Sequence, residues 1–167
     1  MKQYFKFMVE WNNSTREKHK ADNSYLLSVL FLNYQSMTMS NFEKSEHNKK
    51  FIMRYIMIQH EGVTEDEIRV FTDNELYLQA VLTFRKAFPD YAIDVEDITA
   101  EGDFVISHGI FKGTHMGDFH GIAPTHRKVI FPTMVKYQVI DDKIVNAWPM
   151  FDQMELFEQL GAIHRPT

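Results

Sequence analysis

The sequence predicts an α+β fold in which helices come first and an antiparallel sheet follows. Apolar residues recur at helical spacing as far as Phe88, and the period changes to two from Tyr91 onward. Helical spacing returns only in the last segment, near Asp152. Helices followed by a run of strands are typical of α+β domains rather than of alternating α/β folds.

Composition indicates one globular domain of ordinary size. The chain has 167 residues, of which 44% are hydrophobic and 25% charged, and this is enough to bury a core. The net charge of −5 and the lack of a basic stripe argue against nucleic acid as a partner. The absence of cysteine excludes disulfides and fits a cytoplasmic location. No apolar run approaches the length of a membrane span, so we expect no membrane partner.

The first 38 residues differ from the rest of the chain. A polar stretch, NNSTREKHKADNS, leads into the short apolar run YLLSVLFL. This order resembles a signal peptide, but no A-x-A-like cleavage site follows. We therefore expect residues 1–38 to be an N-terminal extension, disordered or derived from a start codon assigned too early, and residues 39–167 to form the functional domain.

The first helix is expected to begin at Ser40, where Ser40 and Glu43 fit a capping box. It would run to about Gln59 before Gly62 breaks it. Its apolar residues recur at spacings that place most of them on one side of the helix: Phe42, Phe51, Ile52, Tyr55, Ile56 and Ile58.

Two more capping boxes predict a second and a third helix. Thr64 with Glu67 opens the second, and Thr72 with Glu75 opens the third. Pro89 ends the third helix, whose apolar face comprises Tyr77, Val81, Phe84 and Phe88.

Long β-branched and aromatic runs then predict an antiparallel meander. Glu101–Gly102 and Asp141–Lys143 separate the runs as hairpin turns. Pro149 cannot donate to a ladder, so the last strand is expected to be bulged there or to lie at an edge. A C-terminal helix follows, with Gly161 as its C-cap.

The stretch GTHMGDFHGIAPT, residues 113–125, joins two of the strands and lies among the histidines at 108, 115, 120 and 126. A metal site is conceivable, but no H-E-x-x-H pairing is present and the intervening residues build turns, so we predict no metal. His108 alternates with apolar residues along its strand. It is either a hydrogen-bonded structural histidine or part of a pocket wall.

Asp152 is the candidate acid or base. If alternation continues through the proline, Asp152 shares a strand face with Ile144, Asn146, Trp148 and Met150. A carboxylate beside Trp and Met would have a raised pKa and could serve as general acid or base. Alternatively, Asp152 only caps the C-terminal helix, a favoured role for Asp. The residues alone leave both roles open.

Taken together, these segments resemble the SnoaL-like polyketide cyclase family, often labelled ester cyclases. The resemblance covers about residues 45–162. It rests on AFPD at 87–90, VED at 95–97, AEGD at 100–103, GTH at 113–115, KIV at 143–145, Trp148 and QLG at 159–161.

The resemblance implies the cone-like fold of nuclear transport factor two, with N-terminal helices packed on a strongly curved antiparallel sheet that encloses an apolar cavity. It also implies that Asp152, as the cavity aspartate, acts as acid and base in an aldol closure without metal or organic cofactor. Residues 113–125 become a crossing between strands, with His115 at the cavity mouth. A homodimer through the sheet is implied as well, on the face that carries Ile130, Met134, Lys136 and Gln138.

Two functions remain open. The first is a cofactor-independent cyclase or isomerase that acts on a small apolar carbonyl compound, with Asp152 as the catalytic residue. Its substrate-binding residues would be His108, Phe111, His115, Tyr137, Asn146, Trp148 and Met150. The second is a non-catalytic binding module, because Asn146 and Ala147 stand where the family usually has Glu and His.

Overall fold

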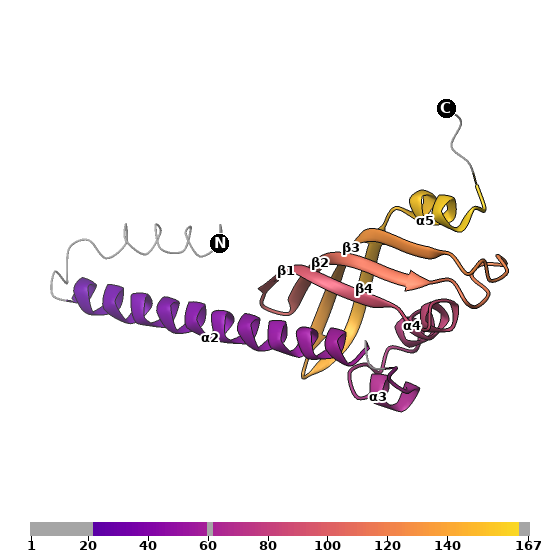
Figure 1. Ribbon diagram of the computed structural model, residues 1–167. Helices are drawn as coiled ribbons and strands as arrows, with labels where there is room; N and C mark the ends of the chain where they lie inside the picture. Colours follow the sequence, from indigo (N-terminus) through magenta and orange to yellow (C-terminus); the bar gives the residue numbers. More distant parts are fainter. Residues whose placement is uncertain (1–21, 60–61, 164–167) are drawn as a thin grey trace. The chain divides into compact units, whose positions relative to one another are not determined.

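The computed structural model describes residues 22–59 and 62–163 and confirms the α+β class (Figure 1). A four-stranded antiparallel sheet lies between α4 and α5 in the sequence. The elements are α2 (Asp22–Gln59), α3 (Glu65–Arg69), α4 (Glu75–Ala87), β1 (Ala92–Glu101), β2 (Phe104–Thr114), β3 (Lys128–Ile140), β4 (Lys143–Phe151) and α5 (Gln153–Leu160).

Helix α2 begins well before the predicted start. Ser40 lies inside the helix, so the capping box predicted there is wrong. The physical reason is that no glycine or proline interrupts the sequence from Asp22 to Gln59. The chain divides into two compact units, Met1–Ser40 and Asn41–Thr167. The first 21 residues of the predicted extension lie outside the described residues.

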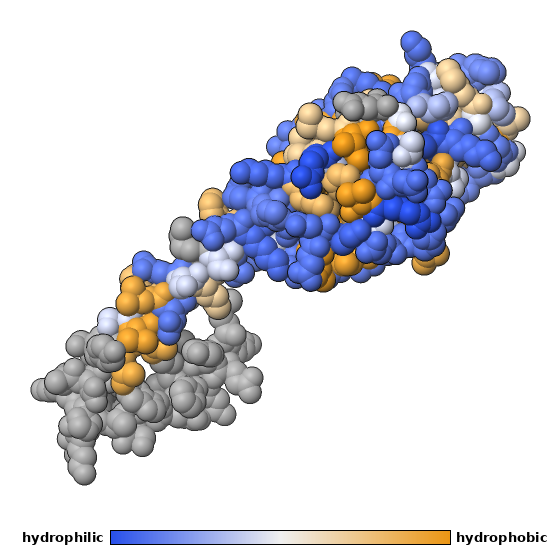
Figure 2. Space-filling model, turned by 90° about the horizontal axis from the view of Figure 1, so that it is seen from below, coloured by the Kyte–Doolittle hydropathy of each residue, from blue (hydrophilic) through white to orange (hydrophobic). Residues whose placement is uncertain are grey.

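The part of α2 before Ser40 carries large apolar side chains that are exposed. Five of them are more than half exposed: Leu27, Phe31, Leu32, Tyr34 and Met37. Figure 2 shows hydrophobic side chains at the surface of this part of the helix. In the described part of the chain, no helix combines the length and the apolarity needed to cross a membrane.

The four strands pair in sequence order, and each hairpin is antiparallel. The two predicted hairpin turns are confirmed: β1 and β2 meet at Gly102–Asp103, and β3 and β4 meet at Asp141–Asp142. Asp141 and Asp142 adopt positive φ, 49° and 57°, as a type I′ turn requires. β4 is an edge strand, which accommodates Pro149 as predicted.

The sheet curls around a core on its concave face. β3 alternates almost perfectly, with buried odd-numbered residues and mostly exposed even-numbered residues. The C-terminal half of α2 packs against one end of this face, where Ile52 and Tyr55 are fully buried. A second cluster joins the end of α4, Phe111, Phe131 and the apolar face of α5.

Local signals set the other helix ends, with one correction. The capping box at Thr64 is confirmed. The one predicted at Thr72 is wrong, because Asn74 is the N-cap of α4 and accepts from the Tyr77 N–H at 3.0 Å. Thr72 instead donates its buried hydroxyl to the Ile144 carbonyl at 2.7 Å. α5 starts after Asp152 and ends at Gly161 in the left-handed conformation, as expected.

Candidate functional site

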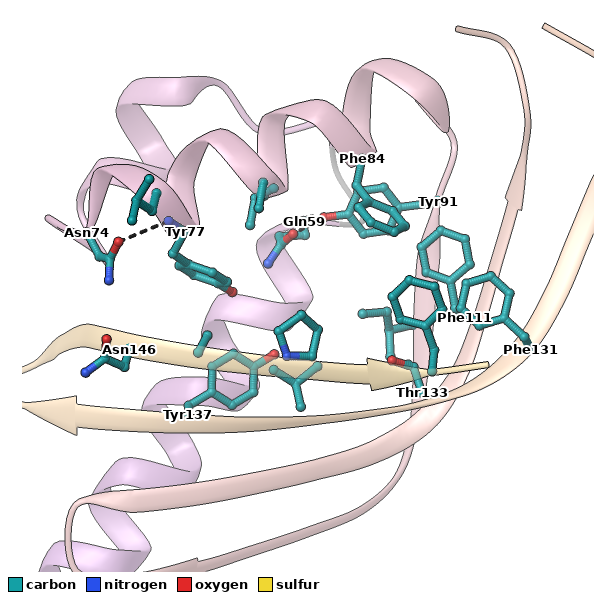
Figure 3. A pocket seen from close by; sticks show the side chains of 18 residues that line it. Gln59, Asn74, Tyr77, Phe84, Tyr91, Phe111, Phe131, Thr133, Tyr137 and Asn146 are labelled. Carbon is teal, nitrogen blue, oxygen red and sulfur yellow. Dashed lines mark hydrogen bonds between the residues drawn. The ribbon is translucent and has the colours of Figure 1, made fainter. Parts of the chain in front are cut away.

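A cavity of about 380 Å³ lies between α4 and the concave face of the sheet (Figure 3). The inner sides of all four strands, one face of α4 and the end of α2 contribute to its lining. Most lining side chains are aromatic or aliphatic. A volume of this size suits a small organic molecule.

One end of the cavity is an aromatic wall of four rings, Tyr91, Phe111, Phe131 and Phe151. Tyr91 directly precedes β1, and the other three come from β2, β3 and β4; the ring centroids of the cross-strand pair Phe111 and Phe131 lie 4.7 Å apart at 16°. Tyr91 stacks on Phe111 at 5.5 Å and 14°, and Phe84 of α4 meets Phe151 edge-on at 5.8 Å. The wall therefore offers flat faces to an aromatic or conjugated ligand.

Toward the other end lies a phenol cluster, Tyr55, Tyr77 and Tyr137. The Tyr55 and Tyr77 hydroxyl oxygens lie 2.7 Å apart, and the Tyr55 and Tyr137 rings meet edge-on at 6.3 Å. Tyr77 and Tyr137 line the cavity from α4 and β3 (Figure 3), and Tyr55 contacts both of them. Burial raises the pKa of all three phenols, so each keeps its proton at neutral pH.

Gln59 connects the phenol cluster to the aromatic wall. Its side-chain oxygen accepts the hydroxyl proton of Tyr91. Its backbone carbonyl accepts from Arg85 at 2.9 Å, and the same guanidinium lies 5.4 Å from the centroid of the Tyr91 ring. Arg85 is therefore engaged behind the lining and does not place a charge in the cavity.

The remaining polar groups at this end are amides used by the protein itself. Asn74 donates to the Val145 carbonyl at 2.8 Å, and Asn146 donates to the Gln138 side chain at 3.0 Å. Among the described residues that line the cavity, none is Asp, Glu, His, Lys or Arg. His60 and Glu61 follow Gln59 in sequence and lie outside the described residues. The described lining is electrically neutral.

Three of the residues predicted for the substrate site line the cavity. Phe111 belongs to the aromatic wall and Tyr137 to the phenol cluster, and Asn146 lies at the cavity edge. The sequence placed Tyr77 and Phe84 on one helix face but not in the site, and it did not single out Gln59 or Tyr91. The sequence indicated the helical spacing of Tyr77 and Phe84, but not the contact of this helix with the sheet.

Trp148 and Met150 do not line the cavity, and their predicted role as walls is corrected. Ile144 pairs with Val139, whereas Asn146 pairs with Gln138, so Val145 is an extra residue in β4. This bulge reverses the alternation after Ile144. Trp148 and Met150 consequently lie on the convex outer face, 45% and 58% exposed, while Pro149 and Phe151 face the cavity.

The two predicted histidines also lie outside the lining. His108 is on the outer face, paired across the sheet with Met134, and its Nδ1 lies 3.5 Å from a Glu96 carboxylate oxygen. His115 is fully buried in the connection between β2 and β3. Its Nδ1 accepts from the Thr125 N–H at 3.2 Å, and burial lowers its pKa.

Asp152 has the capping role. Its carboxylate accepts from the Glu155 N–H at 3.0 Å at the start of α5, and its side chain is not part of the cavity lining. Its neighbour Phe151 does line the cavity. The catalytic role proposed for Asp152 stays a prediction.

The connection at residues 113–125 is built by tight packing and strained backbone. A Cβ at Gly117 would overlap the Lys86 carbonyl oxygen, and Gly121 has φ of 82°. His120 and His126 take positive φ as well. The described residues contain no group of three or more His, Cys, Asp or Glu side chains placed to hold a metal ion.

The family model described as SnoaL-like polyketide cyclase matches residues 60–160, more than half of the chain. The chain belongs to the SnoaL-like polyketide cyclase family. The match includes α4, the whole sheet and α5, and thus most of the lining of the cavity. None of the curated proteins matches the chain in sequence.

Solved structures share the fold of this chain. AclR from Streptomyces galilaeus, a suggested hydroxylase, is 21% identical with a TM-score of 0.64, covering 74% of this chain and 86% of its own. A SnoaL-like polyketide cyclase from Agrobacterium tumefaciens is 20% identical with a TM-score of 0.56, covering 66% and 95%. TsrD from Streptomyces laurentii is 18% identical with a TM-score of 0.58, covering 68% and 94%. At these identities the likeness concerns the fold.

Proposed function

We propose that this SnoaL-like protein holds a small, neutral, largely apolar carbonyl compound in the cavity between α4 and the sheet. The observation that carries the proposal is the lining: four stacked or tilted rings at one end, protonated phenols at the other, and no charged group among its described residues.

The neutral lining favours an uncharged ligand for an energetic reason. An ion in such a cavity loses its hydration without gaining a partner of opposite charge. A flat apolar ligand instead buries its surface against aromatic rings, with a gain of roughly 25 cal/mol for each Å². A carbonyl oxygen can accept from a phenol, so this site suits a carbonyl group.

Conversion of such a compound, by the cyclase or isomerase type of proton transfer, is the second candidate. Membership of the family favours it, and phenols that keep their protons can polarise a carbonyl. It needs a base, for which the family resemblance suggests Asp152. No metal or organic cofactor is invoked in this proposal.

The test is a thermal-shift series on the full chain. 2-Acetylnaphthalene and an aromatic β-keto ester are compared with 2-naphthoate, which has similar size but carries a negative charge. A ligand at about 100 times its Kd adds about 2.7 kcal/mol to the free energy of unfolding. We expect stabilisation by the ketone and the ester only; equal stabilisation by the naphthoate would contradict a neutral site. Chromatography of the β-keto ester after incubation then separates conversion from binding.

We also propose that two copies associate through the outer face of the sheet. Its centre is apolar and exposed at Met134, Trp148 and Met150, and Met134 pairs with Met150 across β3 and β4. Lys136 lies 5.4 Å from the Trp148 ring and 4.3 Å from the Phe104 ring. Exposed apolar groups that cluster in this way are typical of interfaces.

Light scattering after size-exclusion chromatography tests the association. We expect a dimer for the natural chain and a monomer for Trp148→Glu, because a carboxylate would be buried without a partner. Val70→Glu is the matched control, since Val70 is 64% exposed at the C-cap of α3 and belongs to none of the strands. A dimer that persists in Trp148→Glu would remove the outer face as the interface.

A further inference from the structure

We propose that Tyr77 and Tyr137 form a subsite that recognises a carbonyl oxygen and thereby selects ketones and esters over hydrocarbons of the same shape. This inference rests on the proposed function, because it assigns the polar end of the same cavity. It adds the specificity-determining residues and the orientation of the ligand.

Gln59 determines the direction of the hydrogen bonds that lead into the phenol cluster. The Tyr91 hydroxyl donates to the side-chain oxygen of Gln59. The amide nitrogen of Gln59 is therefore left to its other neighbour, Tyr55, whose pKa it lowers as a hydrogen-bond partner while burial raises it. In the proposed arrangement Tyr55 accepts from this amide.

The hydroxyl groups of the phenol cluster can each donate once. A phenol has one proton to donate and two lone pairs that accept. With Gln59 donating to it, Tyr55 turns its proton toward the Tyr77 oxygen, 2.7 Å away. Tyr77 accepts this proton and has its own left to give. This proton can go to its neighbour Tyr137, and a carbonyl oxygen placed between the two phenols would take it over.

Tyr137 lines the cavity from β3, opposite α4. Ser107 and Tyr77 are its hydrogen-bond neighbours and lower its pKa, while the larger effect of burial raises it. Both lining phenols therefore remain protonated at neutral pH. A carbonyl oxygen placed between them has two lone pairs and can accept from both.

The ligand's orientation follows from the aromatic wall at the other end. A flat ring stacked near Phe111 and Phe131 directs a substituent toward Tyr77 and Tyr137 (Figure 3). Hydrogen bonds that follow one another in the same direction polarise each other, so the last O–H of the chain is a stronger hydrogen-bond donor than an isolated phenol. A carbonyl benefits from this, and a C=CH₂ group of the same shape does not.

The experiment compares 2-acetylnaphthalene with 2-isopropenylnaphthalene, which differ only in C=O against C=CH₂. Affinities of both probes are measured by fluorescence on the natural chain and on Tyr77→Phe and Tyr137→Phe. Loss of one neutral hydrogen bond should reduce the preference for the ketone about fivefold to tenfold in each variant. Phe131→Leu is the control, because it weakens the wall and should lower both affinities without changing their ratio.

A second readout needs no variant. The carbonyl stretching frequency of ¹³C-labelled 2-acetylnaphthalene should fall on binding to below its value in cyclohexane, because donation from a phenol weakens the C=O bond. A frequency equal to that in cyclohexane would overturn the subsite, even if a variant fails to fold. An unchanged ketone preference in both folded Tyr variants would overturn it too, with the proposed function intact. Failure of both probes to bind would overturn the proposed function and, with it, this inference.

Discussion

Asp152 can be assigned a role by exchanging it for two different residues. In Asp152→Ala the Glu155 N–H loses the acceptor that lies 3.0 Å away, and loss of such a cap costs about 1 kcal/mol. In Asp152→Asn an amide oxygen replaces the carboxylate oxygen, and Asn caps helices about as well as Asp. We therefore expect the unfolding midpoint to fall by about 3 °C in the Ala variant and to stay nearly unchanged in the Asn variant.

The assay combines thermal unfolding with binding of 2-acetylnaphthalene and turnover of an aromatic β-keto ester. Capping alone predicts that Asp152→Asn keeps its stability, its binding and whatever turnover the natural chain shows. Gln153→Ala is the control for the helix start, because Gln153 is exposed and is not the N-cap. If Asp152→Asn kept its stability and binding but lost turnover, the carboxylate would reach the substrate, and our reasoning from the neutral lining would be refuted. If Asp152→Ala were as stable as the natural chain, the capping argument would fail.

Three further predictions concern the fold. Gly117→Ala should destabilise the protein by more than about 2 kcal/mol in urea unfolding, because the added Cβ would overlap the Lys86 carbonyl oxygen. The control is Gly62→Ala: Gly62 has φ of 75°, a Cβ there would meet nothing within 4 Å, and the loss should be only about 1 kcal/mol. Equal losses in the two variants would contradict the close contact of Gly117 with Lys86. The lowered pKa of His115 means that the folded state disfavours protonation of this imidazole. The stabilising effect should therefore be complete above pH ~6.5 and be lost as the pH falls from there toward the lowered pKa. His115→Asn should reduce this dependence of the free energy of unfolding on pH; an unchanged dependence would mean that other groups cause it. A fragment of residues 39–167 should unfold within about 2 °C of the full chain, because the described buried positions of α2 begin at Ser45; a large drop would show that the earlier part of α2 supports the core.

Local signals predicted the order of elements and several of their ends. Asp141–Asp142 forms its turn because short polar side chains tolerate positive φ, and Gly161 ends α5 because glycine does so without strain. Each of these effects acts within a few residues. They can therefore be inferred from the sequence without knowing what the segment packs against.

The cavity could be predicted only in part, because its lining depends on contacts far apart in the sequence. Phe111 and Tyr137 were among the candidate walls and do line the cavity; they lie on β2 and β3, whose register is regular from Phe104 to Thr114. Gln59 and Tyr91 are 32 residues apart, and their hydrogen bond exists only because α2 and the start of β1 meet in the folded chain. Neither composition nor residue spacing indicates that these two segments contact each other.

The bulge at Val145 determines which residues of β4 face the cavity and which lie on the outer face of the sheet. It pairs Ile144 with Val139 and Asn146 with Gln138, so every later residue of β4 is turned to the opposite face. If Val145 paired with Gln138 in a regular ladder, Trp148 and Met150 would enter the cavity in place of Pro149 and Phe151. Two large side chains would then fill the space beside the aromatic wall, and the outer face would lose its apolar centre. The open cavity and the apolar outer face therefore both depend on the same bulge, and its position follows from the pairing of β3 with β4 rather than from Pro149.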